Sequence, residues 1–135
     1  MSHNLKIEIL LPATPAQVMQ MITDQKQIEI WSGEDAVFEA KEDGAFSMFG
    51  GWAIGAIQKL SADELSFTWK TSEWPEDVED SVVNIKLKAD GEQTLVVLNH
   101  KNLPDEDEVK SHKSGWNDFY FTPLEDYLMI RYNAE

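Results

Sequence analysis

The longest periodic pattern in the chain lies near its C-terminus, in residues 114–128. Apolar side chains recur there with the i, i+3, i+4, i+7 spacing of one face of an α-helix. They are Trp116, Phe119, Tyr120, Pro123, Leu124, Tyr127 and Leu128. Asp118 falls on the opposite side. The pattern predicts a long helix, from about Gly115 to Arg131, whose aromatic face packs on a large surface.

Two residues should disturb this helix. Gly115 costs roughly 1 kcal/mol inside a helix relative to alanine, so we expect a break near Ser114 and Gly115. Pro123 should bend the helix, because it lacks an amide donor and its ring clashes with the preceding turn. The four acids of residues 105–108 follow a proline and suit a helix N-terminus ahead of the break.

The first part of the chain predicts one strand and two short helices. Residues 5–11 alternate between apolar and polar side chains, as in a half-buried strand. Thr14 and Gln17 have the spacing of a capping box at a helix start. Asp24 resembles a second N-cap, and Gly33 is placed to close the second helix.

Between residues 35 and 100 the patterns favour β-strands throughout. The expected strands are residues 36–41, 45–49, 52–60, 65–71, 82–88 and 94–100. Gly55 inside the third of these marks a bend or a close approach to the backbone. Asp90 and Gly91 form a two-residue hairpin signal. The lack of alternating strands and helices indicates an antiparallel α+β domain.

Length and composition add a few limits. A chain of 135 residues is expected to form one domain, residues 1–135, with its core in residues 5–131. It has no cysteine, and therefore no disulfide and no cysteine-ligated metal. No apolar run approaches the roughly 18 residues of a membrane span, and the first residues do not resemble a signal peptide. We therefore expect a cytoplasmic protein.

Acidic residues strongly outnumber basic ones. Eleven Lys and Arg stand against 25 Asp and Glu, which gives a formal net charge of −14. This charge repels phosphate backbones and anionic membrane surfaces, so neither nucleic acid nor a membrane is an expected partner. The acids concentrate in residues 73–80 and 105–108. They indicate either solvated loops or an acidic face for a basic partner protein.

Several local motifs, taken in order, resemble one superfamily. They are residues 12–18 followed by Trp31, residues 43–46, 65–69 and 94–100, and Gly115 and Trp116 with Phe121, Pro123, Leu124, Tyr127 and Leu128. Together they resemble the START-like helix-grip (SRPBCC) superfamily. The resemblance implies an α+β fold in which a curved antiparallel sheet of about six to seven strands wraps around a long C-terminal helix, with two short helices after the first strand.

Three stretches resemble one family within this superfamily. Residues 69–76, 81–85 and 115–121 resemble the C-terminal domain of the activator of the 90-kDa heat-shock-protein ATPase. The resemblance covers roughly residues 5–128. The eukaryotic co-chaperone also has a separate N-terminal domain that performs much of the ATPase stimulation. No counterpart of that domain is expected in these residues, so the resemblance implies a binding domain more directly than a complete activator.

No motif for catalysis stands out. His3, His100 and His112 lack the spacing of metal ligands, and no glycine-rich phosphate loop is present, so no metal, cofactor or catalytic residue is assigned. Some members of the superfamily are cyclases or hydroxylases with polar groups in the central cavity. The candidates for such groups are Glu39, Lys70, Asn99 and His100. A cyclase- or hydrolase-like enzyme is therefore an alternative that rests on the fold alone.

Binding is the favoured class of function. The chain has five tryptophans, and its inward-facing aromatic residues form either a filled core or a cleft between sheet and helix that holds a small apolar or aromatic ligand. The expected lining residues are Phe38, Phe46, Met48, Trp52, Ile54, Phe67, Trp69, Trp116, Tyr120, Leu124 and Tyr127. The hydroxyls of Tyr120 and Tyr127 would orient the ligand. The hypothesis is a non-enzymatic binding domain, either a monomer or a weak dimer.

A protein partner is the second hypothesis. Trp74 lies beside Glu76 and Asp77 in the acidic stretch. If exposed, it would be a suitable anchor for a partner such as a 90-kDa heat-shock protein. The alternative is that Trp74 folds back over the rim of the sheet.

Overall fold

The computed structural model describes residues 3–133, in which seven strands form one antiparallel sheet. The strands are β1 (His3–Leu11), β2 (Val37–Phe38), β3 (Ala45–Met48), β4 (Ala53–Leu60), β5 (Glu64–Thr71), β6 (Ser81–Asp90) and β7 (Gln93–Leu103). Their order is β1-β7-β6-β5-β4-β3-β2. Strands β2 to β7 thus form a meander, and β1 closes one edge by pairing with β7.

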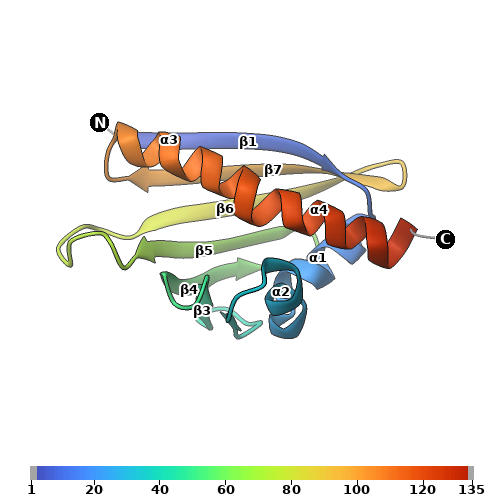
Figure 1. Cartoon of the computed structure of the whole chain (residues 1–135), viewed down its shortest axis with the longest axis horizontal. Coiled ribbons are helices and arrows are strands. Elements are labelled where there is room, and N and C mark those ends of the chain that lie inside the picture. The colour runs from blue at the N-terminus through green and yellow to red at the C-terminus, as the bar shows by residue number, and fades with distance from the viewer. Residues whose placement is uncertain (1–2, 134–135) are drawn as a thin grey trace.

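A long C-terminal helix crosses one face of this sheet (Figure 1). Its consecutive segments are α3 (Glu106–Gly115), η1 (Trp116–Phe121), α4 (Thr122–Leu128) and η2 (Met129–Asn133). Two short helices, α1 (Pro15–Thr23) and α2 (Gln25–Ser32), follow β1 and lie near the C-terminal end of the long helix. The predicted order of strand, two helices, strands and final helix is confirmed.

The helix boundaries follow the capping signals of the sequence. Thr14 and Gln17 form the predicted capping box, each bonding the other's backbone amide. Asp24 accepts hydrogen bonds from the amides of Lys26 and Gln27 at the start of α2. Gly33 ends α2 with a φ of 74°, a left-handed conformation that glycine adopts without strain.

Most predicted strands are present, with one clear exception. Residues 36–41 were expected to form a strand, but β2 contains only two residues. The amide of Lys41 bonds the carbonyl of Glu39 at 2.7 Å, so the chain already turns there. Gly55 marks a close approach as expected, because a Cβ at this position would lie 1.8 Å from the carbonyl oxygen of Thr68.

The expected break at Ser114 and Gly115 is wrong. Gly115 is helical, with φ −62° and ψ −43°, and the helix runs through it from Glu106. The irregularity comes afterwards, in the π-helical segment η1, where the amide of Thr122 bonds the carbonyl of Asn117. This segment ends beside Pro123, which is the second residue of α4 and cannot donate an α-helical hydrogen bond to the preceding turn.

The π-helical segment changes which aromatic residues face the sheet. Its hydrogen bonds join residues five apart, which brings Trp116 and Phe121 onto one face. Phe121 is consequently 1% exposed, whereas Phe119, which the α-helical spacing placed inward, is 65% exposed. Trp116, Tyr120, Leu124 and Leu128 are buried as expected.

Candidate functional site

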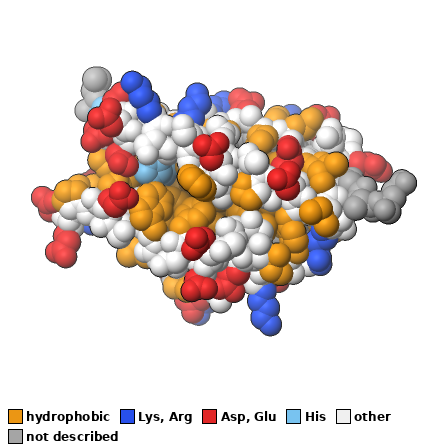
Figure 2. Space-filling model, viewed as in Figure 1, with side chains coloured by type: hydrophobic (Ala, Val, Ile, Leu, Met, Phe, Trp, Pro, Cys, Tyr) orange, Lys and Arg blue, Asp and Glu red, His pale blue; other side chains and the backbone are white. Residues whose placement is uncertain are grey.

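An open cleft of about 490 Å³ lies beside the first half of the long helix. Its helix side comprises Ser111, His112, Gly115, Trp116, Asp118, Phe119, Tyr120 and Pro123. Its other side comprises Ser32, Glu34, Phe49, Trp52 and Trp69. The cleft therefore lies between the helix, the end of α2, the β3–β4 turn and β5. Figure 2 shows this face, where hydrophobic side chains gather below the helix with acidic side chains around them.

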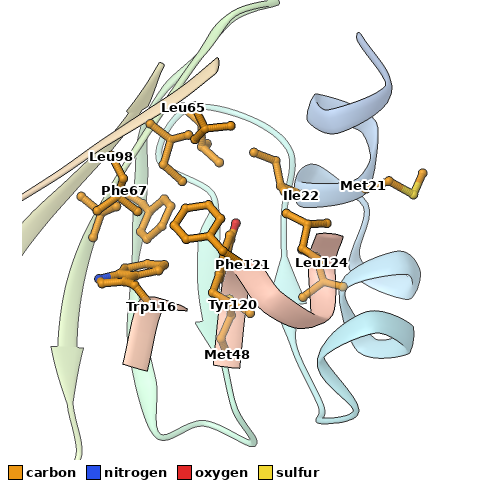
Figure 3. Packing of buried hydrophobic residues seen from close by; sticks show 14 of the residues in the cluster. Met21, Ile22, Met48, Leu65, Phe67, Leu98, Trp116, Tyr120, Phe121 and Leu124 are labelled. Atoms are coloured by element: carbon orange, nitrogen blue, oxygen red, sulfur yellow. The ribbon is translucent and has the colours of Figure 1, made fainter. Parts of the chain in front are cut away.

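The buried side of the helix separates the cleft from the core. Figure 3 shows Trp116, Phe121 and Leu124 pointing from the helix into the cluster formed with the sheet and α1. Phe67 of β5 and Ile22 of α1 are almost fully buried in that cluster. The space below the helix is thus filled by side chains, and the cleft opens at its flank.

His100 is held on this inner face by a complete set of hydrogen bonds. Its Nδ1 accepts from Trp116 Nε1 at 3.1 Å, so the ring proton belongs on Nε2. That nitrogen lies 2.7 Å from Ser81 Oγ, whose own hydroxyl donates to the carbonyl of Trp69. Burial lowers the pKa of His100 to about 3, and the nearby His112 acts in the same direction. The imidazole is therefore neutral.

His112 has a similar arrangement at the wall of the cleft. Its Nε2 accepts from Trp69 Nε1 at 3.1 Å, and its Nδ1 lies 3.0 Å from the carbonyl of Glu108. The bonds assign the proton to Nδ1. Burial lowers the pKa of His112, although Glu108 and Glu73 oppose that shift. Each buried histidine thus accepts a hydrogen bond from one tryptophan, which requires the neutral form.

We call the six rings Trp52, Trp69, Trp74, Trp116, His100 and His112 the tryptophan–histidine cluster. The centroids of Trp69 and Trp116 are 5.0 Å apart, and those of the two histidines 5.2 Å. Trp52 stacks on His112 at 6.0 Å, and its indole donates to Glu73 at 2.9 Å. The cluster gives the cleft a rigid aromatic wall whose polar atoms already have partners within the protein, apart from the indole nitrogen of Trp74.

The structure places the predicted lining residues in four different surroundings. Those that line the cleft are Trp52, Trp69, Trp116 and Tyr120. Those that fill the core instead are Phe38, Phe46, Met48, Phe67 and Leu124. Tyr127 is half-buried and its hydroxyl bonds Gln27, away from the cleft. The prediction that Ile54 lines the cleft is wrong, because its side chain is 54% exposed on the outer face of β4, where alternate residues point away from the core.

The interpretation of Trp74 as an exposed anchor is also wrong. Its side chain is 8% exposed and packs 5.6 Å from His112, so it folds back over the sheet. Its Nε1 is buried, and no hydrogen-bond partner for it occurs in residues 3–133. Glu76 and Asp77 are exposed in the same loop.

The four polar candidates for an enzyme do not share one site. Glu39 is exposed and bonds the amide of Ala45. Lys70 bonds the carbonyl of Glu76 outside the sheet. Asn99 and His100 are consecutive in β7 and therefore point to opposite faces. Only His100 faces the interior, and both of its ring nitrogens are engaged.

Two features are absent from residues 3–133. No group of three or more His, Asp or Glu side chains in this part of the chain is arranged to hold a metal ion. Within the same range, no helix is both long and apolar enough to cross a membrane.

The sequence interpretation missed His112, Phe49 and Glu34 as lining residues. A signal for His112 was present, since it precedes Trp116 by four residues and so shares its helical face. The break expected at Gly115 hid this relation. Phe49 reaches the cleft through a turn in which its φ is 57°, a conformation that the apolar pattern does not indicate.

Two solved structures share this architecture. The structure of an HSP90 activator from Plasmodium falciparum superposes with a TM-score of 0.83 at 23% identity, covering 93% of this chain and 95% of that chain. The Aha1 dimer from Colwellia psychrerythraea gives 0.80 at 20% identity, covering 95% and 97%. These likenesses confirm the helix-grip fold.

The sequence comparison identifies the family. Residues 12–129 match the family described as Activator of Hsp90 ATPase homolog 1-like protein, and the chain belongs to that family. The "Activator of 90 kDa heat shock protein ATPase homolog" of Dictyostelium discoideum is 28% identical over 117 residues, which is 85% of this chain. The chain spans only 30% of the length of that relative.

Proposed function

We propose that this domain is a non-enzymatic binding protein that holds a small apolar or aromatic molecule in the cleft beside the long helix. The observation that carries the proposal is the cleft itself, about 490 Å³ and walled by Trp52, Trp69 and Trp116. Ligand pockets have volumes of about 300–1,000 Å³ and mostly apolar linings with a few polar groups. The polar groups of this lining include Ser32 and Ser111.

The rigid wall also supports binding. The indoles of Trp69 and Trp116 are fixed by hydrogen bonds to the two buried histidines. A wall that is already ordered loses little conformational entropy when a ligand arrives. Flat aromatic molecules could stack on the half-buried ring of Trp52, which meets the buried Trp69 edge-on.

The proposal is tested by titrating a panel of apolar and aromatic metabolites while recording tryptophan emission and melting temperature. A cleft-filling variant, Gly115→Leu, should abolish any response, because Gly115 lines the cleft and a Cβ there meets nothing within 4 Å. The control is Ser114→Leu, one residue earlier on the exposed side of the helix. No response from any compound, or equal responses in both variants, would contradict the proposal.

A second candidate is a co-chaperone-like module for a 90-kDa heat-shock protein. Its support is the family match together with the likeness to the HSP90 activator from Plasmodium falciparum, of whose solved chain 95% is covered. The exposed carboxylates of Glu76 and Asp77 would be the contact, rather than Trp74. A pull-down and an ATPase assay with the organism's own chaperone test it. No binding at roughly 10–50 µM, well above the Kd range of stable complexes, or binding unchanged by E76K/D77K, would count against it.

A further inference from the structure

We propose that the cleft selects aromatic ligands that carry a positive charge, such as an ammonium group, over neutral or anionic ligands of the same shape. This inference rests on the proposed function, because it assigns a chemical class to the ligand of the same cleft. It follows from the charges at the rim, the electron-rich wall and the neutral histidine between them.

The charges at the rim have one sign. Glu34 and Asp118 line the cleft from opposite sides, one after α2 and one on η1. Among residues 3–133, no lysine or arginine lines it. Opposite charges attract strongly at the edge of an apolar wall, where the effective dielectric constant is below that of water. An anionic ligand would meet two carboxylates and no compensating cation.

The wall between these carboxylates suits a cation. Phe49 and Trp52 are half-buried, and their rings meet edge-on with centroids 6.2 Å apart. Aromatic faces attract ammonium groups through the ring quadrupole, and tryptophan does so best. Glu73 accepts the indole hydrogen of Trp52 at 2.9 Å, and a carboxylate there increases the negative potential on the ring face.

The histidine in the wall does not offset this negative potential. His112 Nε2 accepts a hydrogen bond from Trp69, so this nitrogen carries no proton. Its ring stacks on Trp52 rather than presenting a charge to the cleft. The cleft is open to solvent. An ammonium group can therefore remain partly hydrated at the rim while the aromatic part of the ligand enters, which avoids the cost of burying a bare charge.

The test compares three probes that share one ring system. They are 1-naphthylmethylammonium, 1-naphthylmethanol and the 1-naphthaleneacetate anion, titrated by isothermal calorimetry at low and at high salt. The high-salt series is needed because the whole chain carries a charge of −14, which attracts any cation weakly. We expect the cation to bind at least about tenfold more tightly than the alcohol at both salt concentrations. We expect no measurable binding of the acetate.

Two double variants locate the effect. Glu34→Gln with Asp118→Asn should weaken binding of the cation at least about fivefold and leave binding of the alcohol unchanged. Asp90→Asn with Glu92→Gln removes the same charge at the exposed β6–β7 turn and should leave both unchanged. The turn should keep its geometry because Gly91, which has the positive φ of 63° in this turn, is unchanged.

The outcomes separate the inference from the proposed function. Equal binding of cation and alcohol, or equal losses in the two double variants, would overturn the charge preference while the cleft remains a ligand site. Tighter binding of the acetate would overturn it as well. Failure of all three probes to bind would overturn the charge preference and count against the proposed function.

Discussion

The buried imidazole of His100 makes the stability of the fold depend on pH. Its side chain is 0% exposed, and burial lowers its pKa to about 3 from an ordinary value of 6.5. Between these values the unfolded chain binds a proton that the native protein does not bind. Stability from this group is therefore fully present above pH 6.5 and is lost as the pH falls toward 3.

The size of the effect follows from the pKa difference. Each pH unit below 6.5 removes about 1.4 kcal/mol from the free energy of unfolding until the native pKa is reached. Lowering the pH from 7 to 5 should thus cost about 2 kcal/mol through His100 alone. His112 acts in the same direction, because burial lowers its pKa too.

A comparison of variants isolates the contribution of His100. Glutamine at this position can still accept from Trp116 and donate to Ser81, but it does not titrate. Urea denaturation at pH 5, 6, 7 and 8 should show that His100→Gln loses about 2 kcal/mol less than the natural protein between pH 7 and 5.

The reasoning would be refuted if His100→Gln lost as much stability as the natural protein over this interval. A second readout does not depend on the variant's folding. In the natural protein, the NMR signal of the His100 ring should keep a constant chemical shift from pH 7.5 to 5, because the ring stays neutral. A midpoint of titration above pH 5 would contradict the assigned hydrogen bonds.

The remaining predictions concern the long helix and the tryptophans, and each is checked by urea denaturation at pH 7. Phe121→Ala should lower the free energy of unfolding by about 3–5 kcal/mol, whereas Phe119→Ala should lower it by no more than about 0.5 kcal/mol. The reverse order would contradict the π-helical segment. Gly115→Ala should stabilise by about 0.5–1 kcal/mol, because the site is helical and open, and a loss would show hidden crowding. Trp69→Phe should lower the free energy of unfolding by at least about 1 kcal/mol more than Trp74→Phe does, because the Trp69 indole donates a hydrogen bond to His112 and the buried Trp74 indole has no partner within residues 3–133. Equal losses would show that the bond from Trp69 contributes little to stability.

Local signals in the sequence were sufficient for the frame of the fold. Thr14, Asp24 and Gly33 act at close range, through bonds to amides two or three residues away or through a single backbone conformation. The strands of the meander are joined mostly by tight turns, so their order in the sheet follows their order in the chain. The wrapping of the sheet around the helix was predicted from the family resemblance and not from these local signals.

The long helix shows where local rules fail. The cost of Gly115 in a helix is about 1 kcal/mol, whereas burial of a large side chain contributes about 1.5–3 kcal/mol. Burial of Trp116 and Phe121, on one face of the helix just after Gly115, thus outweighs the local preference. The π-helical segment then shifts the buried face, which a search for 3.6-residue periodicity cannot detect.

The cleft was only partly predictable for a related reason. Trp116 and Tyr120 belong to a periodic pattern, and Trp69 to an alternating strand, so their orientation follows from their spacing. Phe49 and Glu34 reach the cleft from turns, where orientation depends on individual backbone angles. The hydrogen bonds that pair each histidine with a tryptophan join residues 16 and 43 positions apart, beyond the reach of local patterns.

The most direct test of the ligand site uses the indole N–H signals of the five tryptophans in a ¹⁵N-labelled sample. Addition of the tightest-binding naphthyl probe should shift the signals of Trp52, Trp69 and Trp116, which line the cleft. The signal of Trp31 should stay in place, because its indole bonds the carbonyl of Met21 in the core. Absence of any shift at saturating probe, or an equal shift of Trp31, would contradict a ligand site in this cleft.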